Sequence, residues 1–189
     1  MGKPNVLTAG YVPLPAWLFF STIAGFFATD YSPIASHVSV MTLEDGLAHS
    51  LANVAALTSG VALVLFGVGI WQLSKRRFSA GALCWILFGI SMVANGIWPM
   101  GGPLHGLYIV GIFSVLAPSL SVLDLADQAL QRSLHRVTVF CSLASVLYLW
   151  LLLNGFDPVG YSGLTQRIFG SISYAWPLIF AFKKSMSSH

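Results

Sequence analysis

Charged residues are scarce in this 189-residue chain. Only 8% of the residues are Asp, Glu, Lys or Arg, whereas 56% are hydrophobic, and the mean hydropathy is +0.79. A soluble domain could not cover its surface with so few polar groups. The composition therefore predicts a polytopic membrane protein. Because a membrane-spanning helix takes about 20 residues, the chain has room for about six spans and for no separate soluble domain.

Cysteine is also scarce, and this excludes two kinds of stabilising site. Cys84 and Cys141 each lie alone within an apolar run, so neither a disulfide framework nor a thiolate metal site is indicated. The few basic residues form no stripe with stacking aromatic residues. The net charge of +3 therefore does not indicate a nucleic-acid partner.

The long apolar runs predict an all-α membrane bundle of six transmembrane helices in a single domain, residues 1–189. The expected helices cover about 12–29, 43–74, 79–98, 105–123, 137–153 and 166–182. The spacing from Thr42 to Asp45 predicts a capping box at the start of the second helix. The residues from Asp124 to Arg136 are expected to form a charged connection.

The basic residues predict the orientation of the helices. With both termini in the cytoplasm, eight of the nine Lys and Arg residues lie inside and only Arg167 lies outside, as the positive-inside rule requires. The inverse topology would place those eight residues outside. We therefore expect both termini to be cytoplasmic.

This topology gathers most of the polar residues at the outer ends of the helices. The segment from Asp30 to Ser39 is rich in hydroxyl groups, and Asp45, His49 and Asn53 share one helix face because they lie four residues apart. We expect an outward-facing polar pocket. Its candidate ligand-binding residues are Asp30, Tyr31, Ser32, His37, Glu44, His49, Asn53, Asn95, His105, Gln166 and Arg167.

Arg167 is expected in the first turn of the sixth helix, where the helix dipole disfavours a cation by about 0.3–1 kcal/mol. A compensating partner is therefore expected. The candidates are a carboxylate of the chain (Asp30, Glu44 or Asp157), an anionic ligand, or solvent reached by a side chain that extends to the membrane interface.

Three short motifs carry a resemblance to a known family. They are Asp30-Tyr31-Ser32-Pro33-Ile34 with His37 and Ser39, Gly102-Pro103-Leu104-His105-Gly106 after Trp98-Pro99, and Gly163-Leu164-Thr165-Gln166-Arg167. In this order they resemble the bacterial membrane family named domain of unknown function 998, which is itself similar to the Frag/DRAM/Sfk group of six-helix proteins.

The resemblance implies a six-helix fold, one site built from the three motifs, and the bacterial inner membrane as the location. It brings no established activity. An acidic residue often follows the aromatic-Pro pair in that family, but Met100 and Gly101 stand there in this chain. A possible metal ligand is therefore missing.

Three classes of function remain open. The first is non-catalytic: the pocket binds a lipid head group, a small anionic ligand or a partner membrane subunit, with no cofactor. The second is an intramembrane hydrolase in which His37, His49 and His105 bind zinc, although the histidines lack a specific motif spacing. The third is a redox protein that uses haem or quinone, with two of those histidines as haem ligands.

Overall fold

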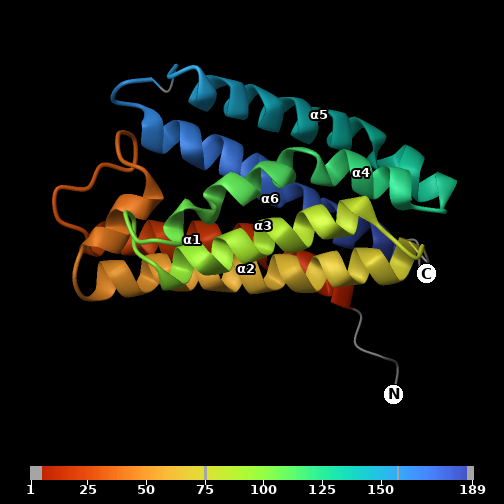
Figure 1. Cartoon of the computed structure of the whole chain (residues 1–189), viewed down its shortest axis with the longest axis horizontal. Coiled ribbons are helices and arrows are strands. Elements are labelled where there is room, and N and C mark those ends of the chain that lie inside the picture. The colour runs from red at the N-terminus through yellow and green to blue at the C-terminus, as the bar shows by residue number, and fades with distance from the viewer. Residues whose placement is uncertain (1–5, 75, 157, 187–189) are drawn as a thin grey trace.

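The computed structural model describes residues 6–74, 76–156 and 158–186, and within these ranges every element is a helix. Figure 1 shows the elements packed lengthwise, with α5 along one edge. In chain order they are η1 Val6–Tyr11, α1 Pro13–Phe27, η2 Val38–Leu43, α2 Leu47–Ser74, α3 Ala80–Ile97, η3 His105–Val115, α4 Ala117–Asp124, α5 Gln128–Leu153 and α6 Ser162–Met186, where η marks a 3-10 helix.

Four helical segments are long and apolar enough to cross a membrane. They are Val6–Phe27, Leu47–Ser74, Ala80–Ile97 and Ala129–Leu153. These segments indicate an integral membrane protein of the all-α class, as the composition predicted. The other two predicted spans correspond to η3 with α4 and to α6, which do not meet both criteria of helix length and hydropathy.

Several of the expected helices have different bounds in the structure, and α6 extends over Ser162–Met186 rather than 166–182. α5 begins at Gln128, within the expected charged connection, because the Asp127 carboxylate accepts hydrogen bonds from the N–H groups of Ala129 at 2.9 Å and Leu130 at 3.1 Å and so caps the helix. The expected fourth helix is divided into η3 and α4. Pro118 lies in the first turn of α4, where its missing N–H is tolerated, whereas within an α-helix that began at His105 it would remove a backbone hydrogen bond.

The capping box expected at the start of the second helix is absent. Thr42 belongs to η2, and its hydroxyl donates to the carbonyl of Ser39 at 2.6 Å and accepts from the N–H of Met100 at 2.9 Å. Glu44 is extended, and Gly46 has a φ of 74°. Because a positive φ turns the chain at this glycine, α2 begins only at Leu47.

Close approach of small residues joins α2 to α3. A Cβ atom added to Gly60 would lie 2.7 Å from the carbonyl oxygen of Gly89, and one added to Gly89 would lie 2.7 Å from the carbonyl oxygen of Gly60. Nearby, Phe66 packs edge-on against Trp85, and Trp85 stacks on Trp176 of α6 with ring centroids 5.4 Å apart. α2 and α3 are therefore the most closely packed pair of helices, and aromatic rings connect this pair to α6.

The connections divide between the two ends of the bundle, as Figure 1 shows. The "recess end" carries the connections α1–α2, α3–η3 and α5–α6. The "basic end" carries the connections α2–α3 and α4–α5, together with the beginning of η1 and the end of α6. The hydroxyl of Tyr11 lies 3.3 Å from that of Ser185, so the first and last described segments meet at the basic end.

Candidate functional site

At the recess end, the start of α6 packs directly against the α1–α2 connection. Leu164 donates its N–H to the carbonyl of Ile34 at 2.9 Å, and the hydroxyl of Ser162 donates to the carbonyl of Ala35 at 2.6 Å. A Cβ atom on Gly163 would lie 2.3 Å from the carbonyl oxygen of Ser36. Only glycine therefore allows this approach of backbone to backbone.

Arg167 fixes the same contact from one turn further along α6. Its Nη1 donates to the carbonyl oxygens of Pro33 at 2.8 Å and Gly163 at 3.2 Å, and its Nη2 donates to the Tyr31 hydroxyl. The guanidinium carbon also lies 5.6 Å from the centre of the Tyr31 ring, within the range of a cation–π contact. Beside it, Gln166 accepts the N–H of Val38 at 2.7 Å.

The predicted partner of Arg167 was a carboxylate, an anionic ligand or solvent, but its observed contacts are two carbonyl groups and a tyrosine. Among the residues that the structure describes, no carboxylate forms an ion pair with Arg167. Asp157, one of the three expected carboxylates, lies outside the described residues. Asp30 is described and exposed, with a φ of 51°.

His49 connects the α1–α2 connection to the second turn of α2. Its Nδ1 lies 2.8 Å from the carbonyl oxygen of Thr42, and its Nε2 lies 2.9 Å from Nδ2 of Asn53. A carbonyl oxygen only accepts, so Nδ1 carries a hydrogen. Nε2 faces the side-chain amide of Asn53, so both ring nitrogens of His49 have a partner.

Two amide oxygens lie unpaired at the same ends of α2 and α3. Within the described ranges, the side-chain oxygens of Asn53 and Asn95 are buried and have no hydrogen-bond donor. A buried acceptor without a donor costs about 1–3 kcal/mol. This part of the bundle therefore has an excess of acceptors over donors.

An open recess of about 290 Å³ lies beside His49. It is lined by Thr42, Leu43, Glu44, Asp45, Gly46, His49 and Pro99. Neither Glu44 nor Asp45 has an ion-pair partner in the part of the chain that the structure covers, and the recess is therefore electronegative. Leu43 and Leu47 beside it are 60% and 51% exposed, so an apolar surface adjoins the two carboxylates.

Comparison with known proteins places the whole arrangement in one family. The sequence model of the family described as "Protein of unknown function (DUF998)" matches residues 12–183. The chain belongs to the DUF998 family. The predicted resemblance to this family is confirmed, while the wider similarity to the Frag/DRAM/Sfk group stays a prediction. No curated protein and no solved structure matches this DUF998 protein.

The predicted site residues of this DUF998 protein fall into two groups at the recess end. Tyr31, Gln166 and Arg167 belong to the contact between the α1–α2 connection and α6, and the Ser32 hydroxyl accepts from the N–H of Ala35 within that connection. Glu44, His49 and Asn53 belong to the recess and to α2 behind it. His105 opens η3, and its Nδ1 lies 2.9 Å from the carbonyl oxygen of Trp98.

The three histidines of the hydrolase alternative do not converge. In the described part of this family member, no group of three or more His, Cys, Asp or Glu side chains is arranged to hold a metal ion. His37 precedes η2, His49 lies on α2, and His105 opens η3. The fold places each of these histidines on a different element, and the geometry does not support a three-histidine zinc site.

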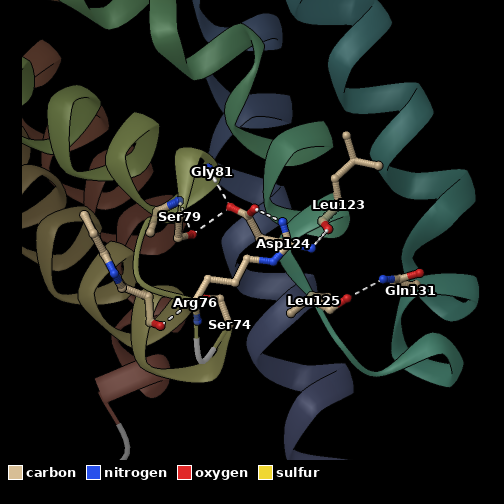
Figure 2. Close-up of polar contacts among 10 residues, drawn as sticks. Ser74, Arg76, Ser79, Gly81, Leu123, Asp124, Leu125 and Gln131 are labelled. Atoms are coloured by element: carbon tan, nitrogen blue, oxygen red, sulfur yellow. Dashed lines mark hydrogen bonds and ion pairs between the residues drawn. The ribbon is translucent and has the colours of Figure 1, made fainter.

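The structure also reveals a polar cluster at the basic end that the sequence did not indicate. Figure 2 shows the buried carboxylate of Asp124 accepting from the Ser79 hydroxyl at 2.7 Å, from the N–H of Gly81 at 2.9 Å and from Arg76 at 3.4 Å. Asp124 ends α4, and Ser79 caps α3. The carboxylate thus joins α4 to the start of α3, where the helix dipole favours a negative charge.

Of the two residues that form this cluster with Arg76, only Ser79 can be recognised from the sequence. Ser79 directly before an apolar run is a typical N-cap residue. Its partner Asp124 is 45 residues away along the chain, and nothing in the sequence near Asp124 distinguishes it from Asp127. Only the packing of α4 against α3 separates the buried interhelical carboxylate from the exposed helix cap.

Proposed function

We propose that this protein is a non-catalytic membrane protein whose recess binds the amine-bearing head group of a phospholipid, such as phosphatidylethanolamine. The observation that carries the proposal is the open recess in which Glu44 and Asp45 have no cationic partner among the described residues. A cation in the recess would compensate both carboxylates. An anionic ligand would be repelled there, so the small anionic ligand expected from the sequence is disfavoured at this position.

The neighbouring groups support a primary ammonium ion in particular. The unpaired acceptors that line the recess are the carboxylates of Glu44 and Asp45. A primary ammonium group has three N–H donors and no acceptor, which complements such a surface. A quaternary ammonium group has no N–H donor, so it would neutralise the negative charge but leave the acceptors without hydrogen bonds.

A lipid is favoured over a free amine by the position of the recess. It lies where α2 begins, at the end of a membrane-spanning helix, and therefore at the depth of the lipid head groups. Exposed Leu43 and Leu47 adjoin it and would contact the glycerol backbone and the acyl chains. The proposed topology has six spans, both termini in the cytoplasm of a bacterium and the recess on the outer face of its inner membrane.

Native mass spectrometry of the detergent-purified protein tests this proposal. We expect phosphatidylethanolamine to bind more tightly than phosphatidylcholine, because the quaternary ammonium group of phosphatidylcholine has no hydrogen-bond donor. The double variant Glu44→Gln, Asp45→Asn should lose roughly tenfold or more in affinity for phosphatidylethanolamine, because hydrogen bonds to a charged group are worth about 1.5–3 kcal/mol.

The matched control is Asp30→Asn, which removes an exposed carboxylate at the same end but outside the recess. It should leave the affinity unchanged. Equal binding of phosphatidylethanolamine and phosphatidylcholine, or an unchanged preference in the double variant, would refute the proposal.

A further inference from the structure

A second candidate surface lies on α5, which is the least buried of the four apolar spans. Only 17% of its apolar window is buried, against 50% for α2, and Figure 1 shows α5 at the edge of the bundle. One exposed face runs along it at spacings of three and four residues, which keeps its members in line. This face, the "α5 stripe", consists of Arg132, Arg136, Phe140, Leu143, Leu147 and Trp150.

The two arginines at the head of the α5 stripe have no anionic partner. Arg132 and Arg136 are exposed, and in the described part of the chain neither guanidinium forms a hydrogen bond or an ion pair. The described carboxylates of the basic end are engaged elsewhere: Asp124 joins α4 to α3, and Asp127 caps α5. Both positive charges therefore stay uncompensated by the protein.

The positions of Arg132 and Arg136 on α5 favour the binding of an anion. Arg132 lies in the second turn of a helix that begins at Gln128, and Arg136 lies one turn further along. Both side chains therefore lie one turn apart on the same exposed face, and guanidinium groups bind phosphate oxygens in a two-pronged geometry.

We propose that the α5 stripe binds one anionic phospholipid, such as phosphatidylglycerol. Its phosphate lies between Arg132 and Arg136, and an acyl chain follows Phe140, Leu143 and Leu147. The ten steps from Phe140 to Trp150 rise about 15 Å along the helix. This is about half of the roughly 30 Å bilayer core, so the apolar part of the stripe has the length of one leaflet.

The charges favour a lipid over a second copy of the chain. In a two-fold symmetric dimer built on the α5 stripe with both copies upright in the membrane, each arginine pair would face the same pair of the partner. Four positive charges would then lie close together at the basic end without a described carboxylate to separate them. A lipid phosphate neutralises one pair without this repulsion. This proposal concerns the opposite end from the recess and does not depend on it.

Competition between lipids on the detergent-purified full chain tests the inference. Native mass spectrometry should show phosphatidylglycerol bound to the monomer in preference to phosphatidylcholine. Each basic residue near an anionic lipid contributes about fivefold to binding, so Arg132→Gln with Arg136→Gln should weaken the binding of phosphatidylglycerol roughly 30-fold. The pair Arg132→Lys with Arg136→Lys should retain part of the affinity, because the charge stays while the two-pronged contact is lost.

Arg77→Gln is the matched control, since it removes an exposed arginine from the same end of the bundle but not from the α5 stripe. It should leave the preference for phosphatidylglycerol unchanged. Thermal unfolding should be the same in all variants because these side chains have no described protein contacts to lose. Equal binding of both lipids, an unchanged preference in the double glutamine variant, or a dimer joined through α5 would overturn the inference.

Discussion

At the scale of single residues, Arg167 shows how a cation beside a helix N-terminus can be satisfied without a carboxylate. Carbonyl oxygens carry partial negative charge, and those of Pro33 and Gly163 accept from the same nitrogen, while Tyr31 offers both its hydroxyl and its ring. The contacts tie residue 167 to the connection that leads to the recess. We interpret Arg167 as a residue that holds the recess end together.

Arg167→Gln should therefore destabilise the detergent-solubilised protein by about 1–3 kcal/mol, because the hydrogen bonds that it loses involve a charged group and the site is partly exposed. Arg167→Lys should restore little, since one ammonium group cannot reproduce the fork that reaches Pro33 and Tyr31. Thermal unfolding followed by circular dichroism measures both effects. A midpoint for Arg167→Gln equal to that of Arg77→Gln would show that the described contacts contribute nothing.

At the scale of helices, the carboxylate of Asp124 connects the end of α4 to the start of α3. A Cβ atom on Gly81 would lie 2.3 Å from the backbone N of Ser121, so the start of α3 and the end of α4 are in direct backbone contact. The Ser121 hydroxyl also accepts from the indole N–H of Trp85 at 3.0 Å. Polar groups therefore connect the two helices where their backbones approach most closely.

Asp124→Asn should lower the free energy of unfolding by about 1–3 kcal/mol, because the charge that attracts Arg76 and the α3 amides is lost from a buried position. Asp127→Asn is the matched control. Asn caps a helix about as well as Asp does, so the exposed cap of α5 should be nearly unaffected. Equal losses of stability in both variants, measured by thermal unfolding in detergent, would contradict the interhelical role of Asp124.

At the scale of the whole molecule, the fold separates the charges of the chain along its long axis. The exposed arginines of the basic end include Arg76, Arg77, Arg132 and Arg136, while Glu44 and Asp45 line the recess at the opposite end. A membrane that keeps basic residues in the cytoplasm orients such a molecule. The proposed topology follows from this separation.

Single cysteines in a variant that lacks Cys84 and Cys141 test the topology. Exposed positions give a clear signal, so we choose Ala35 and Val159 at the recess end and Arg77 and Ala126 at the basic end. In intact cells an impermeant thiol reagent should label Ala35→Cys and Val159→Cys and leave the other two unlabelled. Ser79 is unsuitable as a labelling position because it is fully buried, so a cysteine there would stay unlabelled on either side of the membrane. The reverse pattern would refute both the orientation and the outward recess.

The sequence by itself determined the class of the protein and the ends at which its polar groups gather. Apolar runs of membrane length, and basic residues concentrated in the loops of one end, are signals that depend only on neighbouring residues. Such signals are visible in a single sequence. The same holds for the family motifs at 30–39, 102–106 and 163–167. Hydropathy could not locate the start of α5, because Gln128 to Arg136 is polar and yet helical under the Asp127 cap.

The partners of individual side chains were decided only by the tertiary structure. The Arg167 guanidinium donates a hydrogen bond to the carbonyl of Pro33, which is 134 residues away in the sequence. The Asp124 carboxylate accepts one from Ser79, which is 45 residues away. Thr42 was expected to cap a helix, but its hydroxyl bonds to Met100 of another connection. Such choices depend on which backbone groups the packing of the helices leaves unpaired. A buried unpaired group costs more than a local cap contributes, and the sequence around a residue does not show which distant group needs a partner.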